Sequence, residues 1–206
     1  MIIKARHHWF FYWFFRKYSN WLPRLDFREI VLHTQLEDKG LPVLMIGNHF
    51  SWWDGFLAEY VNRRLFDRKY HVMMLEEQLR TRMFLNKTGA YSIRKGDRSM
   101  LETFRYSAEL LGDPGNVVVM FPQGRIHSQH DHQIVFERGW YRMMDKVENP
   151  VQMVFFIMLT DYYSHRKPSL HIYVYDFHYA GRNLEEVEEA FRERFRESVE
   201  QQKQRA

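Results

Sequence analysis

Hydrophobic residues along the chain change their spacing several times, and these changes predict alternating strands and helices. Short apolar runs of the length of buried strands alternate with segments whose apolar residues recur every three or four positions. We expect strands at Val43–Gly47, Tyr70–Leu75, Tyr91–Ile93, Val117–Phe121, Val151–Leu159 and Leu170–Tyr175. We expect helices at Trp52–Phe66, Glu76–Lys87, Arg98–Leu111 and Phe136–Val147. This alternation predicts an α/β fold: a single domain with a mixed sheet flanked by helices.

The C-terminal segment carries a clear helix signal. Asn183 is a suitable N-cap, and Glu186 follows three positions later, as in a capping box. One apolar stripe then recurs at helical spacing at Leu184, Val187, Phe191, Phe195 and Val199. We expect a helix whose Glu and Arg side chains face solvent and form pairs between residues i and i+4.

The N-terminal segment is dominated by aromatic residues. Residues 7–22 include the unbroken aromatic run Trp9–Phe15, which is too short to cross a bilayer and is flanked by Arg6, Arg16 and Lys17. Trp and Tyr favour the headgroup region, and cations there meet anionic lipids. We therefore expect an N-terminal aromatic interfacial helix, the alternative being a helix packed under the domain core.

Charge and composition narrow the choice of partners. Residues 1–30 contain six Lys or Arg and two Asp or Glu, so they account for the whole net charge of +4. Because nucleic-acid binders more often spread basic charge along a folded face, we expect no nucleic-acid partner.

We expect residues 1–22 to form a membrane-interface segment and residues 23–206 the remaining domain, with Pro23 ending or bending the first helix. The absence of cysteine excludes disulfides, a thiolate nucleophile and thiolate metal sites.

The stretch from Val43 to Asp54 joins a predicted buried strand to a predicted helix and carries two groups suited to acid–base chemistry. His49 and Asp54 are five residues apart, so on one ideal helix they would lie far apart around the axis. They can meet if His49 lies in the turn before the helix and Asp54 in its first turn, which Ser51 as N-cap favours. Asp54 would then bind one imidazole nitrogen and leave the other to act as a general base toward a hydroxyl.

The same residues have a structural alternative. Ser51 followed three positions later by Asp54 is also a capping box, in which Asp54 does no more than cap the helix. A histidine in a strand-to-helix turn can also lack any chemical role. The rest of the chain has to distinguish these interpretations.

Two other predicted strands are followed by polar groups. Arg94 and Lys95 are adjacent cations between two glycines, which can bind a phosphate or form a solvated turn. The next such segment leaves its strand through Phe121, Pro122, Gln123, Gly124 and Arg125. Because ligands bind at the carboxyl ends of strands in open α/β sheets, we expect these groups to converge with His49 on one cleft.

Taken together, these stretches resemble the glycerolipid acyltransferase family of the lysophosphatidic-acid type. Asn48–Asp54 is similar to its first motif, N-H-x-S-x-x-D, and Gly89–Lys95 resembles its second, G-x-x-F-I-x-R. Phe121–Gly124 resembles the start of the third, F-P-E-G-T-R, and Pro150-Val151 is similar to the fourth. The motifs occur in the family's order over most of the chain.

The resemblance implies a mechanism and a set of site residues. His49 would take the proton from a lysolipid hydroxyl, which attacks the thioester of acyl-carrier protein (acyl-ACP) or acyl-coenzyme A (acyl-CoA), while Asp54 holds the imidazole. Substrate-binding roles are implied for Arg94, Lys95, Phe121, Pro122, Gln123, Gly124 and Arg125. We expect an O-acyltransferase for 1-acylglycerol 3-phosphate in phospholipid biosynthesis, with the thioester as co-substrate and no further cofactor or metal. Residues 23–206 would be its catalytic domain, and the protein would be a peripheral membrane protein on the cytoplasmic face.

The chain also departs from the family pattern. Gln123 replaces the acidic residue of the third motif and Ile126 its arginine, while Lys95 stands at the arginine position of the second. The family associates these positions with binding glycerol phosphate, and lysine is a weaker bidentate phosphate partner than arginine. The alternatives are therefore an O-acyltransferase for a non-phosphate lysolipid or glycolipid, or a non-catalytic membrane-surface binding protein.

A histidine-rich segment offers a third class of site. His127, His130 and His132 lie close together in a polar stretch, but their spacing is not that of a standard metal signature. We interpret the segment as a polar loop.

Overall fold

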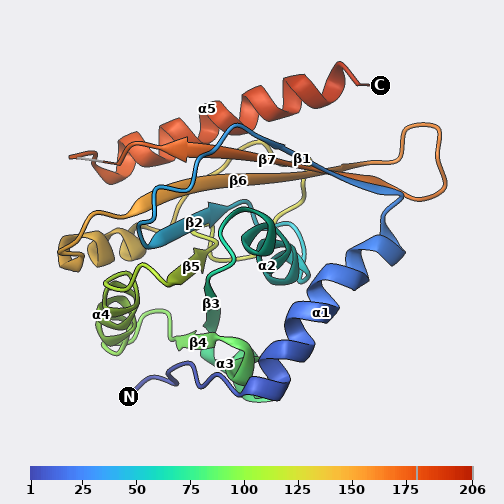
Figure 1. Ribbon diagram of the computed structural model, residues 1–206. Helices are drawn as coiled ribbons and strands as arrows, with labels where there is room; N and C mark the ends of the chain where they lie inside the picture. The colour runs from blue at the N-terminus through green and yellow to red at the C-terminus, as the bar shows by residue number, and fades with distance from the viewer. Residues whose placement is uncertain (180, 206) are drawn as a thin grey trace.

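Seven strands form one sheet in the computed structural model of the protein, which describes residues 1–179 and 181–205 (Figure 1). The strands are β1 Glu29–Thr34, β2 Val43–Gly47, β3 Lys69–Leu75, β4 Ala90–Ile93, β5 Asn116–Met120, β6 Gln152–Asp161 and β7 Ser169–Phe177. Their order is β1-β7-β6-β2-β5-β3-β4, and β6 and β7 are antiparallel whereas the other neighbouring pairs are parallel. The predicted mixed sheet is confirmed.

Helices cover both faces of this sheet (Figure 1). They are α1 Trp9–Asp26, α2 Asp54–Leu65, α3 Glu76–Thr81, α4 Met100–Leu110 and α5 Leu184–Lys203, with 3₁₀ helices η1 Leu85–Thr88 and η2 Arg138–Lys146. Along β2, Val43 and Met45 belong to the core under α1 and α2, whereas Leu44 and Ile46 belong to the core under α4, η2 and α5. All four side chains are fully buried, which explains why the sequence of a central parallel strand is apolar throughout.

The parallel pairing positions the loops that carry the sequence motifs. Strands β2, β5, β3 and β4 are neighbours and run in the same direction. Their carboxyl ends therefore lie at one edge of the sheet, and the segments that begin at Asn48, Phe121 and Arg94 leave from that edge. The expected convergence of the three motifs follows from this register.

One strand was not predicted. Residues Glu29–Thr34 form β1, which pairs in parallel with β7 at the edge of the sheet. Its side chains are half-buried or exposed, because an edge strand has a neighbour on one side only. The segment therefore lacks the continuous apolar run by which the central strands are recognised.

Two predicted helices differ from the structure. The expected helix Glu76–Lys87 is divided into α3, which ends at Thr81, and the separate 3₁₀ helix η1. The expected helix Phe136–Val147 is the 3₁₀ helix η2, in which Trp140 and Met143 are buried. Trp140 and Met143 are three residues apart, which is one turn of a 3₁₀ helix. Because apolar residues three positions apart also occur in α-helices, the hydrophobic pattern does not distinguish the two kinds of helix.

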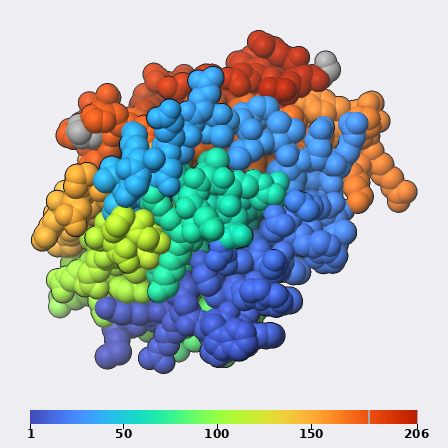
Figure 2. Space-filling view, viewed as in Figure 1, coloured from blue at the N-terminus to red at the C-terminus, as the bar shows by residue number. Residues whose placement is uncertain are grey.

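Helix α1 continues past the expected boundary at residue 22 and ends at Asp26, with Pro23 in its last turn. One face of the helix buries Phe15, whose ring packs against Phe56 at 5.2 Å and Tyr70 at 5.7 Å between ring centroids. The opposite face is apolar but exposed: the exposed fractions of Trp9, Trp13 and Trp21 are 78%, 55% and 56%. In Figure 2 the N-terminal residues, in dark blue, cover the bottom of the molecule, and the blue residues that follow continue up its right side. The interpretation of a helix packed on the domain core is therefore confirmed for one face of α1, and the interfacial role of the exposed face stays a prediction.

The C-terminal helix α5 follows the pattern read from the sequence. Asn183 caps α5 in a capping box with Glu186, and Val187, Phe191 and Phe195 are buried against the sheet. Among the residues that the structure describes, no helix is sufficiently long and apolar to cross a membrane.

Candidate active site

His49 and Asp54 are in contact, as the sequence predicts. The Nδ1 atom of His49 lies 2.7 Å from Oδ2 of Asp54, with His49 in the turn after β2 and Asp54 at the first position of α2. The carboxylate is fully buried, whereas the imidazole is 22% exposed. Because Nδ1 is engaged by the carboxylate, Nε2 is the nitrogen available to a substrate.

Asp54 also organises the turn that carries His49. Its Oδ2 accepts hydrogen bonds from the backbone N–H groups of Phe50 at 2.8 Å and Ser51 at 2.9 Å. The expectation that Ser51 is the N-cap is wrong: Trp53 is the N-cap, and the Ser51 hydroxyl accepts from the Trp53 N–H. Burial raises the pKa of Asp54, while the hydrogen bonds from His49 and the backbone oppose that rise.

The first motif is fixed to the sheet by Gly47 and Asn48. A Cβ atom at Gly47 would lie 2.4 Å from Cζ of Phe156, so only glycine fits at the end of β2. The side chain of Asn48 donates to the Met158 carbonyl at 2.9 Å and accepts from the Met158 N–H at 2.8 Å. The chain before His49 is therefore held against β6, which the sequence does not reveal because Met158 is 110 residues away.

The third motif holds His49 from the other side. The amide oxygen of Gln123 accepts from the His49 backbone N–H at 2.8 Å, and the His127 N–H donates to the His49 carbonyl at 2.8 Å. The ring of Phe121 stacks on the imidazole, with centroids 4.6 Å apart and an angle of 23° between planes. Gln123 is buried and is not among the residues that line the cavity described below, so the structure shows its side chain supporting the base, and its substrate-binding role stays a prediction.

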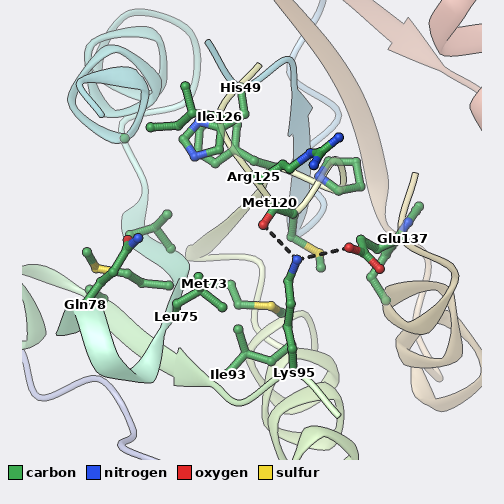
Figure 3. Close-up of a pocket in the computed structure, with 18 of the residues that line it drawn as sticks. His49, Met73, Leu75, Gln78, Ile93, Lys95, Met120, Arg125, Ile126 and Glu137 are labelled. Atoms are coloured by element: carbon green, nitrogen blue, oxygen red, sulfur yellow. Dashed lines mark hydrogen bonds and ion pairs between the residues drawn. The ribbon is translucent and has the colours of Figure 1, made fainter. Parts of the chain in front are cut away.

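A cavity of about 570 Å³ opens beside His49 (Figure 3). It surrounds the carboxyl end of β3 and is therefore lined by side chains from both cores of the protein. On the α2 side these are Phe56, Val72, Met74 and Leu85, and on the α4 side Met73, Met100, Phe104, Met120 and Trp140. Such a lining, with few polar groups around one base, suits an apolar ligand.

Arg94 and Lys95, the two cations of the second motif, have different surroundings. Arg94 donates to the carboxylate of Glu76 at 2.6 Å and is not among the cavity-lining residues. Glu76 is buried and also binds Arg80, and the hydrogen bond from Arg94 lowers the pKa of Glu76 to about 2. Lys95 lines the cavity instead, so the structure brings one of the two cations to the site.

Lys95 reaches across the cavity to the third motif. Its Nζ donates to the Gly124 carbonyl at 2.8 Å and to the Glu137 carboxylate at 3.0 Å (Figure 3). Gly124 has φ of +69°, a conformation that favours glycine, and a Cβ atom there would lie 2.5 Å from the Lys95 ammonium and displace it. No sequence motif includes Glu137, so its place beside Lys95 is not predictable from the sequence.

The remaining residues of the third motif also face the cavity. Pro122, Gly124 and Arg125 line it, and the Pro122 carbonyl accepts from the Glu137 N–H at 2.8 Å. Arg125 donates from Nε to the His127 ring at 3.2 Å. Among the described residues no group of three or more His, Cys, Asp or Glu side chains is arranged to hold a metal ion.

Comparisons with known proteins give a family and a similar fold. A family model described as Acyltransferase matches residues 29–157, which contain all four motifs. The crystal structure of the 1-acyl-sn-glycerophosphate (LPA) acyltransferase PlsC from Thermotoga maritima has a similar fold, with a TM-score of 0.62 and 16% identity. The match covers 91% of this chain and 78% of the PlsC chain. No curated protein is significantly similar in sequence.

The family match spans more than half of the chain and includes the His49–Asp54 pair and its supporting loops. The chain therefore belongs to the Acyltransferase family, as its four sequence motifs predict.

Proposed function

We propose that this protein transfers a fatty acyl group from an acyl-ACP or acyl-CoA thioester to a hydroxyl of a lysolipid. The observation that carries the proposal is the contact between His49 and Asp54 at the wall of an apolar cavity. The base supplies proton transfer, and the cavity supplies a surface on which an acyl chain is removed from water.

The chemistry needs a single base. Nε2 of His49 takes the proton of the acceptor hydroxyl as its oxygen forms a bond to the thioester carbonyl carbon. The C–S bond then breaks, and the departing thiolate receives the proton from the imidazolium. Asp54 stabilises the imidazolium between these steps, and the contact of Phe121 with the ring keeps its plane fixed. No acyl-enzyme is needed, in keeping with a chain without cysteine.

The acceptor that the family resemblance predicts is 1-acylglycerol 3-phosphate, which would make the reaction a step of phospholipid biosynthesis. Lys95 and Arg125 are the cavity cations that can bind its phosphate. The second candidate is a lysolipid whose head group is not a phosphate monoester. The pairing of Arg94 with Glu76 and of Lys95 with Glu137 favours it, because both cations of the second motif already have a carboxylate partner.

We propose also that α1 lies on a membrane surface. Its exposed face carries Trp9, Trp13 and Trp21, and Lys17 and Arg24 are on the same helix. Phe15 of this helix lines the cavity, so a lipid at the helix is close to the site. The cytoplasmic face of a membrane remains the expectation from the sequence.

The function is tested by supplying the purified protein with labelled acyl-ACP or acyl-CoA and a panel of lysolipids. The panel contains 1-acylglycerol 3-phosphate, a neutral 1-acylglycerol, a lysoglycolipid and lysolipids with amino groups. We expect labelled product from at least one acceptor. Transfer to none of them contradicts the proposal and favours the non-catalytic binding protein.

A further inference from the structure

The charged groups on the cavity wall include one that phosphate recognition does not need. Apart from His49, the ionisable charged residues that line the cavity in the described part of the chain are Lys95, Arg125 and Glu137. Glu137 precedes η2, whereas Lys95 follows β4, and their charged atoms meet at 3.0 Å (Figure 3). A carboxylate thus lies directly beside the lysine of the second motif.

Glu137 is held in this position by the backbone. Its N–H donates to the Pro122 carbonyl at 2.8 Å, which fixes the start of η2 to the third motif. Cγ and Oε1 of Glu137 would lie 2.8 and 3.1 Å from a Cβ atom at Gly124, so the glycine leaves room for the carboxylate. The backbone of Glu137 is therefore fixed beside the cavity, and its side chain has room to reach Lys95.

The ion pair is weak enough to open for a ligand. The side chains of Lys95 and Glu137 are 44% and 59% exposed, and an ion pair of that exposure contributes about 0–1 kcal/mol. By contrast, Glu76 is 5% exposed and binds both Arg80 and Arg94. Lys95 and Glu137 can each leave this ion pair to bind a ligand group, whereas Arg94 stays bound to the buried Glu76.

A phosphate monoester fits this wall poorly. Its two negative charges would meet Lys95, but they would also lie beside the Glu137 carboxylate, and like charges at such distances repel. A neutral head group would leave the ion pair as it is and gain nothing from it. A head group with one ammonium and one anionic group satisfies both residues, with the ammonium on Glu137 and the anion on Lys95 and Arg125.

We infer that the acceptor is a zwitterionic lysolipid, and that Glu137 determines this specificity. The inference rests on the proposed acyl transfer and assigns the head-group chemistry of the same site. The ammonium and the anion can belong to a phosphodiester, as in 1-acylglycerophosphoethanolamine, or to an amino acid, as in an Nα-(3-hydroxyacyl)lysine. Both present the same charge pattern to Lys95 and Glu137.

The test measures kcat/KM for labelled acyl transfer to these two zwitterionic acceptors and to 1-acylglycerol 3-phosphate. It compares the wild-type protein with Glu137→Gln, which removes the charge and keeps the shape of the side chain. The matched control is Glu148→Gln, an exposed position outside the cavity lining, which changes the net charge equally. Thermal unfolding verifies that both variants are folded.

We expect the wild type to have a higher kcat/KM for a zwitterionic acceptor than for 1-acylglycerol 3-phosphate. Comparing the two zwitterionic acceptors shows whether the head group is a phosphodiester or an amino acid. Glu137→Gln should shift the preference at least roughly tenfold toward 1-acylglycerol 3-phosphate, because it removes the ammonium partner and the repulsion of phosphate together. Glu148→Gln should leave the preference unchanged. Preference of the wild type for the phosphate monoester, or an unchanged preference in Glu137→Gln, overturns the inference alone. Absence of transfer to all three acceptors also overturns the inference if a neutral 1-acylglycerol or a lysoglycolipid accepts the acyl group, whereas absence of transfer to the whole lysolipid panel overturns the proposed function.

Discussion

The amide oxygen of Gln123 accepts the backbone N–H of His49 at 2.8 Å, so the third motif holds the base of the first. The His127 N–H donates to the His49 carbonyl, so these two hydrogen bonds satisfy both backbone polar groups of His49. The sequence replaces the acidic residue of the family's third motif by Gln123, and this replacement keeps a hydrogen-bond acceptor at the position. The departure therefore leaves the support of His49 intact.

We predict that Gln123→Ala lowers kcat because the partly buried N–H of His49 loses its partner. An unpaired buried donor costs about 1–3 kcal/mol, which corresponds to a loss of roughly 5- to 150-fold if it falls on the transition state. Gln123→Glu should keep activity close to wild type, since its carboxylate also accepts. Steady-state kinetics with labelled donor measures both. If Gln123→Ala turns over as fast as the wild type, the hydrogen bond does not support catalysis.

Asp54→Asn distinguishes the catalytic role of Asp54 from helix capping. The amide oxygen can still accept from Phe50 and Ser51, so the turn should persist, but the negative charge that stabilises the imidazolium is lost. We expect kcat to fall by about 10²- to 10⁴-fold, the range for acid–base assistance, without a lower melting temperature. Asp54→Asn with normal kcat would favour the capping interpretation of the sequence.

The exposed face of α1 predicts binding to lipid vesicles. Replacing Trp9, Trp13 and Trp21 by serine removes aromatic side chains that are 55–78% exposed, so the fold should persist. We expect the variant to sediment less with vesicles that contain anionic lipid, and the binding of the wild type to weaken with salt.

The control for this experiment changes Leu101, Val135 and Tyr162 to serine. These side chains are also 45–63% exposed, but they lie outside α1. If both triple variants bind vesicles as the wild type does, α1 is not the membrane-binding surface.

Because Glu59 is buried, we predict that the stability of the protein depends on pH. This α2 residue is fully buried, its Oε1 lies 3.7 Å from Nε of Arg16, and burial raises its pKa from 4.5 to about 8. Between these values the folded protein keeps a proton that the unfolded chain has lost, so Glu59 makes the free energy of unfolding fall as pH rises.

Glu59→Gln carries no such proton. Its free energy of unfolding relative to wild type should therefore increase from pH 5 to pH 8, by roughly 1 kcal/mol per pH unit. Urea titrations at several pH values measure it, with the exposed Glu148→Gln as control. A constant difference between Glu59→Gln and wild type would show that Glu59 ionises normally.

The central part of the fold was accessible from the sequence because its strands are buried on both faces. Val43–Gly47 and Val117–Phe121 read as apolar runs, and their parallel pairing brings the motifs together. β1 escaped prediction because an edge strand is half-exposed, and η2 because Trp140 and Met143 fit more than one helical period.

The site was predictable to the extent that it is local. His49 and Asp54 are five residues apart, and a short turn suffices to bring them into contact. The partners of the site's other groups are distant in the sequence: Glu137 is 42 residues from Lys95, and Glu76 is 18 residues from Arg94. A single sequence carries no signal for these pairings, although they decide which cations remain available to a substrate.

The most direct test of the account is acyl transfer by His49→Ala, measured with labelled thioester and the best lysolipid acceptor of the wild type. The imidazole is partly exposed and its backbone bonds do not depend on the side chain, so the variant should fold. We predict that turnover falls by at least about 10²-fold with unfolding behaviour close to wild type. Turnover near the wild-type rate in folded His49→Ala would contradict the assignment of His49 as the base.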